Sequence, residues 1–141
     1  MEYKKDNVAH CMAYTYVAFA HLTDGAVDEA EWKNIGGKCW AWIQHFDMDI
    51  DGDGELNGDD IVSLIFDCVV PFYDSMTTEE KIEEFVRIQV VLKAQDWWTD
   101  DTSAAYLKDM KNLAMADGVF AEGEEKFLEI MAKGFGVAVP A

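Results

Sequence analysis

The chain has 141 residues, of which 50% are hydrophobic and 13% are aromatic. That is enough apolar material for one folded domain and too much for a disordered chain. Its 28 acidic residues against 11 basic ones give a formal net charge of −17, which opposes binding to nucleic acid and to anionic membranes. A strongly acidic surface favours cations or basic partners instead.

The N-terminal residues and the cysteines both indicate a cytoplasmic protein. No secretory leader is recognisable in the first residues, and the longest apolar run, residues 61–72, is interrupted by polar residues and too short to cross a bilayer. The three cysteines are odd in number, widely spaced and set among apolar residues, as expected of reduced thiols. We therefore expect a soluble cytoplasmic protein with no membrane attachment.

Apolar residues recur at intervals of three and four along the whole chain, which is the pattern of an all-α protein. We expect a single-domain bundle of six helices at about residues 4–22, 29–46, 58–70, 78–96, 102–115 and 122–134. Thr77 and Glu80 predict a capping box at the start of the fourth helix, and Pro71 predicts the end of the third. The fourth helix is apolar over most of its circumference, so we expect it at the centre of the bundle.

The segment between the second and third expected helices, Asp49–Asp60, matches an EF-hand calcium loop. Aspartates occupy loop positions 1, 3 and 5, a glycine stands at position 6 and an inward-pointing Leu56 at position 8. Starting the loop at Asp47 instead would lose both the apolar anchor and the closing ligand. The candidate metal ligands are Asp49, Asp51, Asp53, Glu55 and Asp60, with Asn57 acting through a water molecule.

The charge of this segment favours a bound cation. Residues 47–60 contain seven acidic side chains and no Lys or Arg. Two like charges ~4 Å apart repel by about 1 kcal/mol in water and about 4 kcal/mol at a protein surface, so folding this segment without a cation is unfavourable. Oxygen ligands without nearby Cys or His select Ca²⁺ or Mg²⁺. Because Asp60 is one carbon shorter than the usual Glu, we expect a lower selectivity for Ca²⁺ and a Kd of roughly 10⁻⁵ to 10⁻³ M. The alternative is an acidic turn in which Asn57, Asp59 or Asp60 caps the next helix.

Two resemblances to known families follow from these residues. The loop, with Asn57 at position 9 and Asp60 at position 12, resembles the calcium loop of dockerin modules. Residues 21–33 and 114–126 align at a constant offset of 93, and each contains an Asp-Gly pair followed seven residues after the Asp by a Glu. The second copy, which begins Ala114-Met115-Ala116-Asp117-Gly118, is similar to a segment of TerB-like tellurite-resistance proteins.

The TerB-like resemblance implies an all-helical bacterial cytoplasmic protein linked to tellurite or general stress resistance. It also implies that the Asp-Gly acids and the glutamates after them are secondary metal candidates, namely Asp24, Glu31, Asp117 and Glu124. The alternative is that these residues only form turns and helix caps.

The sequence does not indicate an enzyme. His10, His21 and His45 lie far apart, and no phosphate-binding, hydrolase or zinc-protease motif is present. We expect a structural or regulatory module in which Ca²⁺ or Mg²⁺ sets the angle between the two helices that flank the loop. Its partner would be an unidentified protein, or a second copy paired through the loop in a homodimer. The alternative function is a metal-sequestering or metal-dependent hydrolase-like protein that also uses the Asp-Gly sites.

Overall fold

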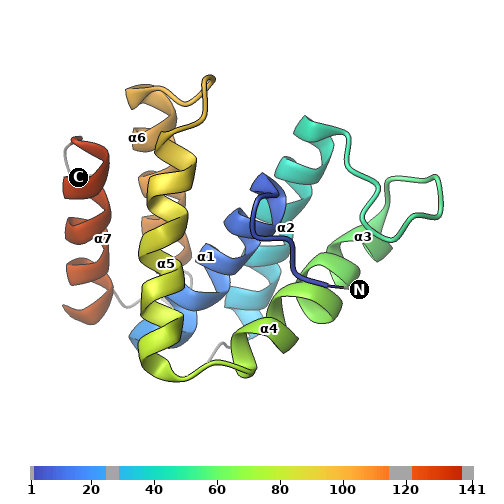
Figure 1. The fold of residues 1–141 in the computed structure, drawn as a ribbon, viewed down its shortest axis with the longest axis horizontal. Coiled ribbons are helices and arrows are strands. Elements are labelled where there is room, and N and C mark those ends of the chain that lie inside the picture. Colours follow the sequence, from blue (N-terminus) through green and yellow to red (C-terminus); the bar gives the residue numbers. More distant parts are fainter. Residues whose placement is uncertain (1, 25–28, 115–121, 138–141) are drawn as a thin grey trace.

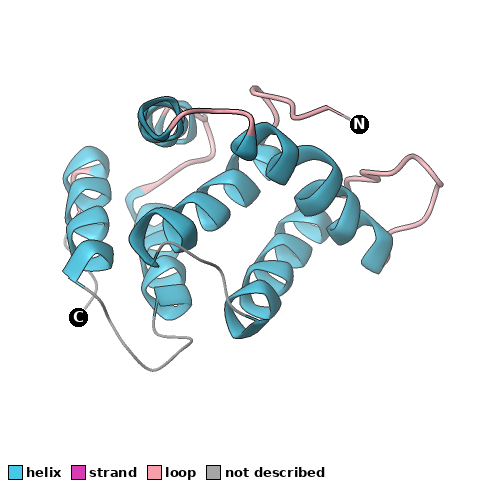
Figure 2. Ribbon diagram, turned by 90° about the horizontal axis from the view of Figure 1, so that it is seen from below, coloured by secondary structure: helices cyan, strands magenta, loops and turns pink. Residues whose placement is uncertain are grey.

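The computed structural model describes residues 2–24, 29–114 and 122–137, and the regular structure in these ranges is entirely helical (Figure 2). The elements are α1 (Val8–Asp24), α2 (Glu29–Phe46), α3 (Gly58–Val62), η1 (Ser63–Val69), α4 (Val70–Asp74), α5 (Thr78–Lys93), α6 (Asp100–Ala114) and α7 (Glu122–Phe135). Because α3, η1 and α4 follow one another without a break, they form one helix in three parts. The described residues therefore hold six helices, and the predicted all-α fold is confirmed.

The centre of the bundle is α1, which contacts α2, η1, α4, α5, α6 and α7 (Figure 1). Every residue from 9 to 20 is buried, so this helix is enclosed on all sides. The prediction that the fourth helix lies at the centre is wrong. That helix, α5, buries one face and leaves Ile82, Val86 and Val90 exposed on the other. Apolar content alone does not distinguish a helix enclosed by the bundle from one with an uncovered apolar face.

The helix that begins at Gly58 does not end before Pro71, as predicted, but continues to Asp74. The N–H of Val70 donates to the carbonyl of Ile65, five residues earlier, so the chain makes a wide π-helical turn just before the proline. Pro71 follows directly, and the wide turn before it lets the helix continue past a residue that has no N–H to donate. The continuation brings Tyr73 into the core, where its hydroxyl lies 2.7 Å from Nδ1 of His21.

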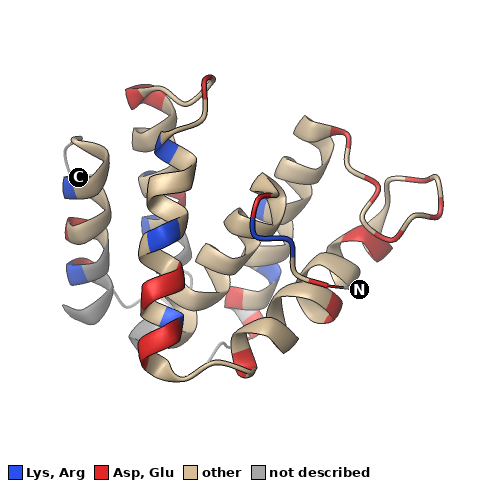
Figure 3. Ribbon diagram, viewed as in Figure 1, with Lys and Arg blue, Asp and Glu red and all other residues tan. Residues whose placement is uncertain are grey.

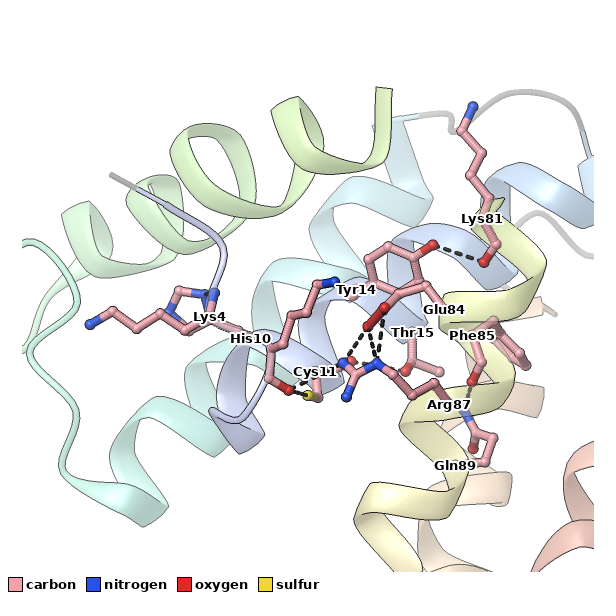
Figure 4. Close-up of polar contacts among 11 residues, drawn as sticks. Lys4, His10, Cys11, Tyr14, Thr15, Lys81, Glu84, Phe85, Arg87 and Gln89 are labelled. Atoms are coloured by element: carbon pink, nitrogen blue, oxygen red, sulfur yellow. Dashed lines mark hydrogen bonds and ion pairs between the residues drawn. The ribbon is translucent and has the colours of Figure 1, made fainter. Parts of the chain in front are cut away.

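The residues that precede α1 are fastened to α5 and to α1 itself (Figure 4). Arg87 forms an ion pair with the buried Glu84, and its Nη2 also donates to the carbonyl of Lys5 over 3.2 Å. The ring of His10 is buried, and its Nδ1 accepts a hydrogen bond from the N–H of Lys4 over 3.2 Å. Burial lowers the pKa of His10 to about 4, so its imidazole is neutral near pH 7.

Among the described residues, no helix combines the length and the apolar character that a membrane crossing requires.

Candidate metal centre

The acidic segment predicted to bind a cation connects α2 to α3 and projects from one edge of the molecule (Figure 1). Acidic residues recur along it, and no basic residue interrupts them (Figure 3). Two apolar side chains fasten it to the protein, because Ile50 and Leu56 are both partly buried against the core. The inward position of Leu56 agrees with the prediction from the loop pattern.

Two glycines turn the first half of the segment back on itself. Gly52 and Gly54 have φ angles of 76° and 85°, in the left-handed region that favours glycine. Their N–H groups both donate to the carboxylate of Asp49, over 3.0 Å from Gly52 and 2.6 Å from Gly54. The amide of Gly54 is also the main reason why the pKa of Asp49 is held below its usual value. Asp49 is thus ionised and fixed in place.

The turn brings three carboxylates together. Asp49, Asp51 and Asp53 each place one ligand atom within 4.8 Å of the others. Oxygens bound to one Ca²⁺ lie about 2.3–2.6 Å from it, so two ligands on opposite sides can be about 4.6–5.2 Å apart. The three side chains therefore lie within the span that one calcium ion requires. Among the described residues they are the one group of three or more His, Cys, Asp or Glu side chains gathered closely enough to hold a metal ion.

The convergence of the three carboxylates disfavours the ionised form of Asp51. Loss of hydration, together with its contacts to Asp49 and Asp53, raises the pKa of Asp51 to about 6. A carboxyl group whose ionised form is disfavoured in this way gains from a neighbouring cation, since the cation stabilises the charged form. The three carboxylates therefore offer a hard divalent ion a site in which its charge relieves repulsion already present.

Asp60, the residue at loop position 12, is completely buried and holds the two halves of the segment together. Its Oδ1 accepts hydrogen bonds from the N–H groups of Ile50 (2.8 Å) and Asp51 (3.3 Å), and its Oδ2 accepts one from the N–H of Asn57 (2.9 Å). The side chain of Asn57 in turn accepts from the N–H of Asp59 and completes a capping box at the start of α3. The structure thus contains the capping that we expected under the alternative of an acidic turn, made by Asn57 and Asp60, whereas metal binding by the loop stays a prediction.

Capping does not exclude metal binding by Asp60. A carboxylate offers about four acceptor sites, and three amide hydrogen bonds leave one of them, on Oδ2, for an ion or a bridging water. Asp60 and Glu55 both lie outside the three-carboxylate group. The Glu55 side chain is exposed, and its N–H donates to the Asp53 carboxylate over 2.9 Å. Ligand roles for Asp60, for Glu55 and, through water, for Asn57 stay predictions.

Of the four secondary candidates, the structure describes the side chain of Glu31 alone. Glu31 is buried on α2. Asp24 is the last residue of α1 and Glu124 lies in the first turn of α7, but their side chains are outside the described set. Asp117 lies outside the described residues altogether. Metal binding by these four residues stays a prediction.

The sequence pattern did not predict that N-terminal residues lie next to the loop in space. A hollow of about 410 Å³ lies between the N-terminal residues and the start of the loop, and Glu2, Lys4 and His10 line it together with Asp47 and Asp49. Nothing in the sequence pattern connects residues so far apart along the chain. Lys4, a basic residue, therefore lines the same hollow as Asp47 and Asp49 of the acidic segment.

Comparison with known proteins adds no identification, because no protein-family model, no curated protein and no solved structure matches the chain. The resemblances to TerB-like proteins and to dockerin modules therefore stay predictions, and the geometry of the loop itself is the basis for assigning a function.

Proposed function

We propose that the Asp49–Asp60 loop binds one Ca²⁺ ion and that the protein is a structural or regulatory binding module whose α2–α3 surface depends on that ion. The observation that carries the proposal is the convergence of the Asp49, Asp51 and Asp53 side chains within 4.8 Å, on a segment that contains no basic residue. Carboxylate oxygens are the ligands that Ca²⁺ prefers, and calcium tolerates the irregular geometry of a flexible loop.

The chemistry of the cluster argues against other metals. Its three ligands are all carboxylates, whereas zinc and copper sites in proteins are rich in Cys and His. Mg²⁺ is smaller, requires nearly octahedral ligands at about 2.0–2.1 Å and retains several waters. We therefore expect Mg²⁺ to bind the same loop more weakly than Ca²⁺.

An ion bound in the loop would restrain the angle between the two helices that flank it. α2 and α3 are in contact, and a Cβ added at Gly36 on α2 would lie 3.7 Å from Cγ2 of Ile61 on α3. This close approach holds the helices together away from the loop. An ion held by Asp49, Asp51 and Asp53, with Asp60 tying both halves of the loop, would restrain them at the loop itself.

The surface controlled in this way is apolar. Val62 and Phe66, on the helix that follows the loop, are 51% and 48% exposed, and the Phe66 ring lies 5.2 Å from the ring of Trp32 on α2. An exposed apolar surface formed by two helices is the kind of feature that binds protein partners. Its shape changes with the angle between α2 and α3, so ion binding would alter what it presents.

Isothermal titration calorimetry of chelator-treated protein tests the ion site. We expect one Ca²⁺ site with a Kd of roughly 10⁻⁵ to 10⁻³ M, lost in Asp49→Asn and in Asp53→Asn and kept in Asp59→Asn. The control carboxylate of Asp59 is exposed and lies outside the cluster. Absence of binding at millimolar Ca²⁺, or binding that survives both cluster substitutions, would refute the proposal.

The same titrations decide whether further sites exist. Additional bound ions that disappear in Asp24→Asn or Asp117→Asn would favour the metal-sequestering or hydrolase-like alternative. NMR spectra with and without Ca²⁺ then test the link between the ion and the surface. We expect amide shifts to extend from the loop into α2 and α3, whereas shifts confined to residues 49–60 would mean that the ion does not affect the helices.

A further inference from the structure

The outer face of α5 carries a symmetric series of residues. Glu79, Ile82, Val86, Val90 and Lys93 are spaced by three, four, four and three residues, so they lie along one side of the helix. The three central side chains are 41%, 49% and 66% exposed, respectively. Glu79 lies in the first turn and Lys93 in the last, and both are exposed.

This face continues across a groove onto α7. The groove has a volume of about 480 Å³, and its lining includes Phe85 and Gln89 of α5 together with Ile130 and Gly134 of α7. Ile130 is 59% exposed, so the α5 series and Ile130 contribute four of the seven large apolar side chains that are exposed in the described residues. A concentration of exposed apolar side chains on one face indicates an interaction surface.

The order of the residues indicates which partner fits. When two copies of α5 lie antiparallel about a two-fold axis at Val86, each Ile82 faces Val90 of the other copy, and the two Val86 side chains meet on the axis. Each Glu79 then faces Lys93 of the other copy, which gives two ion pairs. Within one helix these two charged residues are about 21 Å apart, so they cannot pair with each other in a single chain.

We propose that the α5–α7 face is a self-association surface on which a second copy of this chain binds with its α5 antiparallel. A partner of uniform charge would be repelled by one end of the series, by Glu79 if acidic and by Lys93 if basic. A second copy matches both ends, because a two-fold interface is self-complementary. Lys93 donates to the carbonyl of Gly134 over 3.2 Å, and an ammonium group has three donor hydrogens, so it retains two for the carboxylate of the other copy.

The position of the face also limits the repulsion between two strongly acidic chains. The acidic loop lies at one edge of the molecule, and α5 and α7 lie toward the other (Figure 1). Pairing through α5 therefore keeps the two loops far apart, where salt screens their charges over about 8–10 Å. The proposal is independent of metal binding, and its test is performed with a chelator present.

Sedimentation equilibrium of the full chain, from about 1 μM to about 1 mM, tests the proposal. We expect a monomer–dimer equilibrium that Val86→Asp weakens by more than about tenfold, because it places two carboxylates on the two-fold axis. Ala105→Asp is the control, since Ala105 is exposed on α6 and belongs to neither proposed surface, and we expect it to leave the equilibrium unchanged. Circular dichroism confirms that each variant is folded.

A charge exchange tests the antiparallel geometry independently of the apolar contact. Glu79→Lys and Lys93→Glu should each weaken the dimer by about 2- to 30-fold, since each removes two surface ion pairs. The double variant should restore the dimer, because the pairs form again with their signs reversed. A chain that stays monomeric at all concentrations, a dimer that survives Val86→Asp, or a double variant without recovery would each overturn the proposal.

Discussion

Replacing Asp60 by Ala tests whether this buried carboxylate holds the loop closed in the absence of metal. The substitution removes three hydrogen bonds, donated by the amides of Ile50, Asp51 and Asn57. A hydrogen bond to a charged group contributes about 1.5–3 kcal/mol, but these amides lie near the surface and regain water when the carboxylate is removed. We therefore expect a loss of about 2–4 kcal/mol rather than the sum.

In a chain of this length such a loss lowers the melting temperature by about 6–16 °C. Thermal unfolding followed by far-ultraviolet circular dichroism, with chelator present, measures it. Asp59→Ala is the control, because Asp59 is exposed in the same helical turn, and we expect it to cost less than about 1 kcal/mol. Asp60→Asn keeps the shape and one acceptor oxygen, so it should fall between the two. Melting of Asp60→Ala within a degree of the control would refute the role assigned to this side chain.

Three further substitutions test the loop, the N-terminal residues and the core. Gly54→Ala should lower the free energy of unfolding by about 1–2 kcal/mol, because φ is 85° at this position. Gly58→Ala is its control: a Cβ added at Gly58 has no atom within 4 Å, so the change should be less than about 0.5 kcal/mol. Urea unfolding measures both. His10 has a pKa of about 4 when folded and about 6.5 when unfolded, so the unfolded state binds more protons between these values and stability falls as the pH is lowered from 6.5 to 4. His10→Gln should make that decline less steep. Tyr14→Phe removes a 2.8 Å hydrogen bond to the carbonyl of Lys81 and should cost about 0.5–1.5 kcal/mol.

Each of these three results has a clear contradicting outcome. Equal stabilities of the Gly54 and Gly58 variants would show that the left-handed turn is not required. Parallel stability curves for wild type and His10→Gln between pH 6.5 and 4 would show that burial of the neutral imidazole does not contribute to the pH dependence. A Tyr14→Phe variant as stable as wild type would show that this hydroxyl contributes no net free energy.

The helices were largely predictable because each one buries at least one apolar face, and that face repeats at helical intervals. The bounds of α2 match the prediction at both ends, and α7 differs from it by one residue. Two features of tertiary packing could not be predicted from the spacing of apolar residues. The apolar residues of α1 and α5 look alike in sequence, but α1 is surrounded by helices, whereas α5 has one face without a neighbour in the described residues. The continuation through Pro71 depends on a π-helical turn, which has no reliable sequence signal.

The candidate metal centre was predictable to the extent that its chemistry is local. Asp49, Asp51 and Asp53 belong to one turn, so their spacing and the glycines between them were enough to predict that they converge. The role of Asp60 was harder to predict, because position 12 can supply a ligand or a cap, and the amides that its side chain accepts from depend on how the whole segment folds. Lys4 and His10 reach the hollow beside the loop through long-range packing, which spacing along the chain does not reveal.

The enclosed position of α1 affects how the chain acquires its structure. This helix is synthesised before α5, α6 and α7, which contribute much of its covering. Contacts between residues so distant along the chain slow folding, since a long loop must close before they form. Until the last helices leave the ribosome, the apolar surface of residues 9–20 remains open to chaperones and to other nascent chains. Truncations that remove α7 should therefore reduce the yield of folded protein in the cell far more than the loss of one peripheral helix would suggest.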